Sequence, residues 1–510
     1  MLCEFSRQVG VYAAKLRKLV LYRPRTVSMD FKTRKEWHNH AGNCASLPLR
    51  RYRPSSLSDL REIVTEAERA QVRVRAVGSS HSWSDVAMTP DFLVDPDGLN
   101  QVLSLDASVL KNGISTSHLV EVESGVTVRQ LNEHLDRHGL ALANMGGYDG
   151  QTIAGVTATS THGSGLKFGP LTDAVRSIDL VDGTGRICRV EPHDGPTDEV
   201  KYRSKYSNER ELISRDADFN AVAVGLGCFG LIYSMIVEVT DAFWLNEERK
   251  RSTWEAVRVE LQQGDVLSTN DHYELLLNPY AIDGVHTCLV TTRKRTEPPS
   301  HLPSDKLRRN VLSEFLSSLF ITGRILRFLF NHGPRSTPQR IDAGILGLCD
   351  DGYTNKSYKV FNIGIANNLP GLSAEYGFAL DDQSYISAIE QLLNVAAEAA
   401  RVGDVYQAGP IAVRFVRSCP YYLSPQFERN TVMVEIIAVT GTKGAEDMYY
   451  RYEKAAIEKC GRPHWGQLHH MSNADTVKRL YPSVEQWITV RRRFDPQGRF
   501  DAPFTHRLGL

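Results

Sequence analysis

The sequence has few cysteines, and their spacing suits neither a metal site nor a disulfide framework. Its 510 residues include eight cysteines, which lie far apart and form no Cys-x-x-Cys pair: Cys3, Cys44, Cys188, Cys228, Cys288, Cys349, Cys419 and Cys460. This distribution argues against a zinc site and a small disulfide-stabilised scaffold, and it favours a reducing compartment. We therefore expect no metal in this protein.

The chain also lacks an excess of charge of either sign and any long apolar run. Lys+Arg and Asp+Glu number 60 each, so the composition does not indicate a nucleic acid partner. No window reaches the roughly 18 uncharged apolar residues of a transmembrane helix, and we expect none. A chain of 510 residues is too long for one hydrophobic core, so two or more domains are expected.

The N-terminus lacks the long apolar core and small-residue cleavage site of a secretory signal. Residues 1–25 carry six Lys or Arg against one Glu and include the amphipathic stretch VYAAKLRKLVLY. Such a segment is compatible with a mitochondrial presequence, but an ordinary basic helix or tail is the favoured interpretation. We expect a cytoplasmic location, with the mitochondrion as the alternative.

One apolar stretch stands apart, LSEFLSSLFITGRILRFLF at residues 312–330. Arg324 and Arg327 make this stretch too charged to span a bilayer. A buried helix or a lid over a channel is favoured over a helix that lies on a membrane surface.

Short β-rich runs alternate with helical patterns between about residues 50 and 239. SLSDLREIVTEAERA (56–70) and TVRQLNEHLDRHG (127–139) predict helices, whereas RVRAV, FLVD and HLVEVESGV predict strands. VRSIDLVDGTGRICRV predicts a hairpin that turns at Asp182-Gly183. From about 241 to 459, the strand candidates HYELLLN, HTCLVTTRKR, IAVRFV and TVMVEIIAVTG look antiparallel, with helices at 384–403 and 445–461. We predict an α+β fold without internal repeats.

The sequence GLGCFG at 225–230 matches the dinucleotide fingerprint G-x-G-x-x-G but lacks its context. The fingerprint requires a strand before it and a helix after it. NAVAV (220–224) predicts the strand, but the following LIYSMIVEV is β-branched and alternating. We therefore interpret GLGCFG as a tight turn between two strands.

Two other glycine-rich stretches suit a phosphate better. Gly78, Ser79 and Ser80 follow a predicted strand, and consecutive small residues let backbone N–H groups converge on an anion. The second stretch, NMGGYDGQTIAGVTATSTHGSG (144–165), is rich in Gly, Ser and Thr. Two such loops suit a cofactor with a diphosphate and a flat ring. Two surface turns are the alternative interpretation.

Four ordered motifs resemble those of a known family. GSSHSW (78–83), the 144–165 stretch, GRPHWGQLHH (461–470) and RRRFDPQGRFDAPF (491–504) are similar to the FAD-linked oxidases of the vanillyl-alcohol-oxidase superfamily. The resemblance is to the aldonolactone and alditol oxidases, extends to WHNHAGN (37–43), and spans about residues 40–510.

The resemblance implies a division of the chain. We expect an N-terminal extension at 1–40 and an FAD-binding domain of two α/β subdomains at 41–242. A substrate (cap) domain with an antiparallel sheet flanked by helices is expected at 243–460, followed by a C-terminal segment, 461–510, that returns to the FAD domain.

The resemblance also implies how FAD is held. In this family the His of Gly-x-x-His-Ser is bonded covalently to the 8α-methyl of the flavin, and His81 occupies that position. His162 is expected to brace the flavin loop, and His469-His470 to be solvated or supporting rather than metal ligands. The other expected cofactor contacts are Gly78, Ser79, Ser80, Ser82, Asn144, Gly146, Gly147, Thr152, Gly155, Thr159, Thr161, Gly163, Gly225, Gly230 and His464.

The expected substrate pocket departs from the family pattern. Where the alditol oxidases carry Ser, Glu, Thr and Lys to bind hydroxyls, this chain has Gly147, Ala412, Ile437 and Gln467, and it keeps only Arg414 of that set. A pocket without those groups binds a polyol weakly. We expect a wider, less polar pocket and a larger, less polar alcohol, with sugar-lactone oxidation as the alternative.

Four residues are expected to act in the reaction. The resemblance places Arg414 near the reacting edge of the flavin, where a cation stabilises a developing anion. Glu435 is the leading candidate for the base, and an ion pair with Arg414 that only shapes the pocket is the alternative. Gln467 hydrogen-bonds but cannot act as a base. Gly146 occupies the family's oxygen gate, where glycine admits oxygen; the alternative is a tight turn with positive φ.

The expected reaction is hydride transfer from an alcohol carbon to FAD, with O2 as acceptor and H2O2 as product. The expected partners are thus a small alcohol and molecular oxygen. A dehydrogenase that uses a quinone or cytochrome is one alternative, and a flavin-binding protein without turnover is another.

Overall fold

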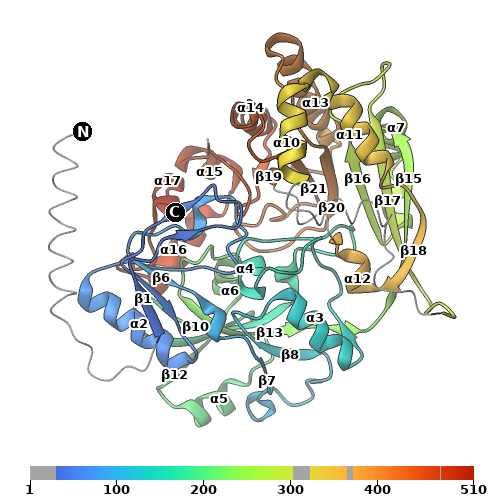
Figure 1. Cartoon of the computed structure of the whole chain (residues 1–510). Coiled ribbons are helices and arrows are strands. Elements are labelled where there is room, and N and C mark those ends of the chain that lie inside the picture. The colour runs from blue at the N-terminus through green and yellow to red at the C-terminus, as the bar shows by residue number, and fades with distance from the viewer. Residues whose placement is uncertain (1–29, 302–321, 365–370, 471) are drawn as a thin grey trace, which may run out of the picture.

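Figure 1 shows the computed structural model of the chain, which describes residues 30–301, 322–364, 371–470 and 472–510. The expectations for residues 1–25, and for the 312–321 part of the apolar stretch, lie outside the described residues. The rest of that stretch lies in helix α10 (Thr322–His332). Within the described ranges, no helix is both long and apolar enough to cross a membrane.

The N-terminal half is built on two sheets. One has the strand order β1-β4-β6-β5, and the other has the order β12-β11-β10-β13-β8-β7. The strands are β1 (Asp30–Thr33), β4 (Arg50–Arg53), β5 (Val74–Ala76), β6 (Phe92–Val94), β7 (Val102–Leu103), β8 (Leu119–Glu123), β10 (Val175–Val181), β11 (Ile187–Glu191), β12 (Arg210–Ser214) and β13 (Leu231–Glu238). Two short pairs accompany them, β2 (Trp37–His38) with β3 (Ala45–Ser46) and β9 (Leu140–Ala141) with β14 (Thr240–Asp241).

Helices of this half include α2 (Leu57–Ala70), α3 (Val128–Arg137), α4 (Ile153–Ala158), α5 (Glu199–Tyr206) and α6 (Asp216–Val222). The Ser56 side chain caps α2 by accepting a hydrogen bond from the Asp59 N–H, as its sequence predicts. Residues Leu60, Ile63, Val64 and Ala67 form one apolar stripe, which packs into a core with β5 and β6.

Helix α6 precedes the GLGCFG turn, so the predicted strand at 220–224 is wrong. Asp216 and Asp218 lie in the first turn of α6, where carboxylates favour a helix N-terminus. Phe219 and Val222 are buried, and a short apolar run alone does not distinguish a strand from a buried helix. The turn leads into β13, so no helix follows it.

The C-terminal half is dominated by one large antiparallel sheet (Figure 1). In the described residues its order is β18-β15-β17-β16-β20-β21-β19-β22. The strands are β15 (Trp244–Thr253), β16 (His272–Leu277), β17 (Thr287–Thr296), β18 (Asp350–Lys356), β19 (Gly371–Ala379), β20 (Ile411–Val416), β21 (Thr431–Val439) and β22 (Arg462–Pro463). The accompanying helices are α7 (Trp254–Gln263), α8 (Asp265–Thr269), α10, α11 (Thr337–Leu346), α12 (Ser357–Phe361), α13 (Ser384–Gly403) and α14 (Ala445–Glu458).

The two faces of this sheet differ in character. Leu275, Val413 and Val434 are register neighbours, so they share one face, and they pack with buried residues of α13 and α14, such as Ile389 and Tyr452. Because side chains alternate along a strand, the residues next to them point to the opposite face. On that face the register pairs Glu274 with Arg414, Ala412 with Glu435, and Glu435 with Glu375. A charged set of this kind on a sheet face indicates a functional site.

The chain then returns to the N-terminal half through α15 (Ala474–Leu480), α16 (Val484–Phe494) and α17 (Pro503–Leu508) (Figure 1). Arg75 of β5 ties this return in place and is 1% exposed. Its guanidinium donates hydrogen bonds to the carbonyls of Leu226 (2.8 Å), Gly227 (3.1 Å) and Phe500 (3.2 Å), and also to that of Val86.

Replacing Arg75 with methionine should destabilise the protein. The variant leaves four carbonyl oxygens without their donor, and each unsatisfied buried group costs about 1–3 kcal/mol. We expect the free energy of unfolding, measured by urea titration, to fall by at least about 3 kcal/mol. Arg73→Met is the matched control, because Arg73 is exposed. Equal stabilities of the two variants would contradict the role given to Arg75.

Candidate active site

A cavity of about 340 Å³ lies between the loops of the N-terminal half and the charged face of the large sheet. Both glycine-rich loops line it, and so does the charged set from the sheet. Of the predicted site residues, it brings together Gly78, Ser79, Ser80, His81, Ser82, Gly146, Gly147, Thr152, Gly155, Thr159, Thr161, His162, Gly230, Arg414, Glu435, His464 and Gln467.

Three predicted cofactor residues do not line this cavity. Gly225 packs against its own turn, where a Cβ would lie 2.6 Å from the Val222 carbonyl oxygen. Asn144 accepts a hydrogen bond from the Met145 N–H, and a Cβ at Gly163 would overlap the Asn144 side chain. Asn144 and Gly163 therefore support the second loop without lining the cavity.

The two glycine-rich loops meet at Thr152. The Thr152 hydroxyl caps α4 by accepting the Gly155 N–H at 3.3 Å. A Cβ at Gly78 would lie 2.5 Å from this hydroxyl, and one at Gly155 would lie 2.9 Å from it. Both positions therefore need glycine for close approach. The loops form a cradle of backbone and small polar groups, which fits the diphosphate of a dinucleotide cofactor.

His81 lies in this cavity between two other rings. Its Nε2 is 3.0 Å from the Tyr148 hydroxyl, and its ring centroid is 4.4 Å from that of His40. Burial, and then the neighbouring His40, lower the pKa of His81 to about 4. Sequence reasoning missed Tyr148, although it is the one aromatic residue of the 144–165 stretch.

Arg414 and Glu435 form an ion pair at the sheet side of the cavity. The Arg414 Nη1 and Glu435 Oε2 atoms are 2.7 Å apart. The other carboxylate oxygen of Glu435 accepts hydrogen bonds from Ser373 (2.8 Å) and Gln467 (3.2 Å). Both oxygens of Glu435 are thus engaged. This agrees with the alternative interpretation of Glu435, an ion pair with Arg414 that only shapes the pocket.

Glu375, which sequence reasoning also missed, lies beside this pair and is 3% exposed. Its Oε1 lies 3.6 Å from Arg414 Nη1 and 3.4 Å from His162 Nε2, but makes no hydrogen bond to the described residues. Burial, the largest single effect, raises the pKa of Glu375, but His162, His464 and Arg414 together outweigh it and lower the pKa to about 2. The available signal was a lone charge in the strand GLSAEYGFA.

His162, Glu375 and His464 are also the one group of potential metal ligands among the described residues. One ligand atom of each lies within 4.8 Å of the others. His162 Nδ1 lies 2.9 Å from the Gly163 carbonyl oxygen, which leaves Nε2 facing the carboxylate. His464 Nδ1 accepts the Gly466 N–H at 3.2 Å, and burial lowers the pKa of His464 to about 4. We interpret the group as a close cluster of two imidazoles and one carboxylate.

The adjacent glycines of the second loop have different surroundings. A Cβ at Gly147 would lie 3.1 Å from Ile363 Cγ2, so Ile363 fills this space and the expected widening is wrong here. A Cβ at Gly146 would meet only the His162 carbonyl oxygen at 3.4 Å and Thr161 Cγ2 at 3.6 Å. Gly146 does not have a positive φ, so the tight-turn interpretation of Gly146 is wrong.

The register of the sheet shows how Arg414 keeps a carboxylate partner. The expected family pattern has Glu two residues before the arginine, where this chain has Ala412. Ala412 faces Glu435 directly across the β20–β21 pair. The carboxylate partner of Arg414 therefore comes from the neighbouring strand.

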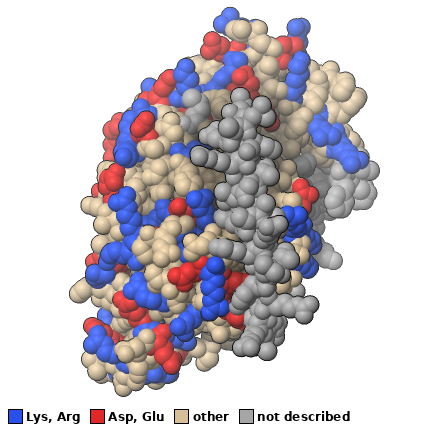
Figure 2. Space-filling model, turned by 90° about the vertical axis from the view of Figure 1, so that its left-hand side faces the viewer, with Lys and Arg blue, Asp and Glu red and all other residues tan. Residues whose placement is uncertain are grey.

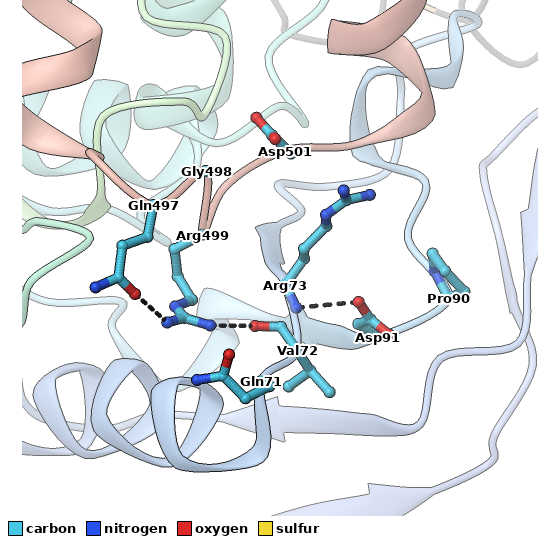
Figure 3. Close-up of a pocket in the computed structure, with 9 residues that line it drawn as sticks. All are labelled: Gln71, Val72, Arg73, Pro90, Asp91, Gln497, Gly498, Arg499 and Asp501. Atoms are coloured by element: carbon cyan, nitrogen blue, oxygen red, sulfur yellow. Dashed lines mark hydrogen bonds between the residues drawn. The ribbon is translucent and has the colours of Figure 1, made fainter. Parts of the chain in front are cut away.

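A second cavity, of about 450 Å³, lies between residues 71–73, residues 90–91 and the C-terminal segment (Figure 3). Arg499 donates to the Val72 carbonyl at 2.9 Å, and the Arg73 N–H donates to Asp91 at 3.0 Å. The Arg499 hydrogen bond joins the C-terminal segment to the N-terminal half, and none of these groups is a predicted site residue. On the face of the molecule that Figure 2 shows, Lys and Arg side chains are interspersed with Asp and Glu side chains.

Two family profiles match the chain. One, described as FAD binding domain, matches residues 48–191, which include both glycine-rich loops. The other, described as D-arabinono-1,4-lactone oxidase, matches residues 236–508, which include the strands of the charged set.

Several known proteins are similar over most of their length. L-gulono-1,4-lactone dehydrogenase of Mycobacterium tuberculosis is 28% identical over 476 residues, covering 92% of this chain and 98% of its own. L-gulonolactone oxidase of Mus musculus is 28% identical over 479 residues, which cover 91% of this chain and 96% of the relative. The crystal structure of cholesterol oxidase from B. sterolicum has a TM-score of 0.74 at 14% identity, covering 96% of this chain and 99% of that one. This likeness confirms the predicted α+β fold.

Proposed function

The chain belongs to the D-arabinono-1,4-lactone oxidase family, and from this premise we propose that it oxidises a substrate alcohol with FAD and molecular oxygen. The expected resemblance is confirmed, and the protein is an FAD-dependent oxidoreductase. The observation that carries the proposal is the charged set of Arg414, Glu435 and Glu375, which faces the glycine-rich cradle across one cavity. Bound FAD supplies the hydride acceptor.

We assign the chemical step to the charged set. A guanidinium in a buried site stabilises the alkoxide that forms as a substrate hydroxyl loses its proton, and we assign this role to Arg414. Glu435 orients Arg414 through the ion pair, and Gln467 and Ser373 hold Glu435 in place. Glu375 Oε1 has no hydrogen bond to the described residues, so it is the acceptor available for a substrate hydroxyl.

The proposed substrate has a polar and an apolar part. Its reacting hydroxyl lies against the charged set, and its remainder lies against Ile363 and Ile437 at the cavity wall. An alcohol that is less polar than a sugar lactone can make both contacts, with its hydroxyl at the charged set and its apolar part at the two isoleucines. Sugar-lactone oxidation is the second candidate, supported by the carboxylate that β21 returns to Arg414 and by the names of the relatives.

Two further assignments complete the proposal. We assign oxygen as the acceptor, because no steric or backbone constraint explains glycine at position 146. A dehydrogenase is the second candidate, supported by the name of the Mycobacterium tuberculosis relative. We also assign His81 as the covalent tether of FAD, since it lies in the cavity next to the cradle.

The substrate proposal predicts a preference for alcohols with an apolar body. Ile363 and Ile437 cannot hydrogen-bond the hydroxyls of a polyol, so those hydroxyls lose their water without compensation. We expect higher kcat/KM for ring-bearing or long-chain alcohols than for sugar alcohols and sugar lactones. The measurement is an anaerobic screen that follows flavin absorbance. A higher kcat/KM for a sugar lactone than for every apolar alcohol would favour the second candidate.

The register predicts that the carboxylate can be moved back to β20. Glu435→Ala should slow flavin reduction by roughly 10²-fold, because Arg414 loses its orienting partner. The double variant Ala412→Glu/Glu435→Ala should recover part of that rate, measured by stopped-flow absorbance. Ala412→Glu alone is the control, since it places two like charges face to face and should lower the melting temperature. A double variant no faster than Glu435→Ala would contradict the relocation.

The oxygen proposal predicts opposite effects for two neighbouring glycines. Gly146→Ala should slow reoxidation of the reduced enzyme by oxygen and leave the substrate KM unchanged, because its Cβ meets no substrate-side residue. Gly147→Ala should raise the substrate KM and leave reoxidation unchanged, because its Cβ presses on Ile363. Stopped-flow mixing with oxygenated buffer measures both. Slow reoxidation of the wild type, with faster reaction towards a quinone, would establish a dehydrogenase.

A further inference from the structure

We propose that Tyr148 is a positioning residue for covalent attachment of FAD, in which its hydroxyl accepts the Nε2–H of His81 and leaves Nδ1 as the nucleophile. This inference rests on the proposed tether through His81 and names the residue and the atom that prepare it.

The ring of His81 is held by contacts on two sides. The Tyr148 hydroxyl lies 3.0 Å from His81 Nε2, and the two ring centroids are 4.5 Å apart at an interplanar angle of 54°. The ring of His40 lies 4.4 Å from that of His81 at 32°. No hydrogen bond joins His81 Nδ1 to the part of the chain that the structure describes. One ring nitrogen is thus engaged, and the other is available.

The backbone of both loops prepares this arrangement. His40 donates its N–H to the Ser80 carbonyl at 2.7 Å, which fixes the segment of His40 beside His81. Tyr148 comes from the second loop, where a Cβ at Gly150 would overlap its hydroxyl. Glycine at position 150 therefore leaves room for the Tyr148 hydroxyl to reach His81.

The hydrogen bond determines which nitrogen can react. A neutral imidazole carries its proton on one nitrogen and a lone pair on the other. When the Tyr148 hydroxyl accepts the Nε2–H, the lone pair lies on Nδ1. Burial and His40 lower the pKa of His81 to about 4, so the ring is neutral at pH 7 and keeps its lone pair.

The attachment step balances with oxygen as the oxidant. A bond forms between His81 Nδ1 and the 8α-carbon of FAD, and one C–H bond of that methyl group breaks. The imidazole passes its Nε2 proton to the Tyr148 hydroxyl, which releases its own proton to solvent. The two protons and two electrons released by this oxidation reduce O2 to H2O2, and the tethered flavin is left oxidised.

The experiment compares attachment rates in full-length protein. Flavin-free wild type, Tyr148→Phe and His81→Ala are mixed with FAD in air, and acid-precipitated samples are assayed for flavin over time. Tyr148→Phe keeps the ring but loses the hydrogen bond, so attachment should slow roughly three- to tenfold with total FAD binding unchanged. Tyr206→Phe is the matched control, because it removes a hydroxyl bonded to Asp106, at 3.1 Å, and does not line the cavity.

A second measurement does not need bound FAD. The ¹⁵N shifts of the His81 ring in flavin-free protein, assigned by difference from His81→Ala, report the tautomer directly. We expect the Nε2–H form in wild type, a mixture in Tyr148→Phe, and Nδ1 as the linkage in the flavin peptide by tandem mass spectrometry of wild type.

The outcomes separate two failures. A wild type that releases all its flavin on acid precipitation would overturn the His81 tether, and the role of Tyr148 with it. Covalent flavin in wild type, together with equal attachment rates and equal tautomer populations in Tyr148→Phe, would overturn only the role of Tyr148.

Discussion

The burial of the Arg75 guanidinium is the constraint on which the cofactor side of the molecule depends. A buried cation without a carboxylate partner must be satisfied by other acceptors. Here carbonyl oxygens from three separate segments supply them, at Val86, at Leu226-Gly227 and at Phe500. Arg75 thereby joins the loop that carries His81, the GLGCFG turn and the C-terminal segment.

This constraint gives the GLGCFG turn its physical explanation. Leu226 and Gly227 have φ values of 51° and 70°, in the left-handed region that disfavours side chains. A Cβ at Gly227 would sit 3.5 Å from the Arg75 guanidinium. The glycine-rich turn therefore serves to direct two carbonyls at a buried arginine, and its likeness to a dinucleotide fingerprint comes from composition alone.

Local sequence signals predicted helices such as α2 well. The pairing of strands that are far apart in the sequence, in contrast, determines which side chains meet in the candidate site. Ser56 and the apolar spacing of 57–70 are enough to predict α2, because cap and stripe are local properties. Glu375 reaches Arg414 only because β19, β21 and β20 are neighbours, which no local pattern reveals. Ile363 fills the space beside Gly147 in the same non-local way. Comparison of motifs position by position therefore did not reveal that Glu435 faces the Ala412 position across the β20–β21 pair.

The cavity lies between the glycine-rich loops and the charged face of the large sheet, and these two surfaces tolerate substitutions to different degrees. On the cofactor side, a Cβ at Gly78 or Gly155 would lie within 2.9 Å of the Thr152 hydroxyl, so a substitution there displaces the group that caps α4. On the sheet side, side chains carry the function and strand pairing holds the backbone, so one residue can take over from another across a register pair. Gly146 and Gly147 lie where these surfaces meet: a Cβ at Gly146 would make only ordinary van der Waals contacts, whereas one at Gly147 would press against Ile363. With the roles proposed for Gly146 and Gly147, acceptor choice and substrate choice can vary independently through two consecutive residues, without disturbing the glycine-rich cradle.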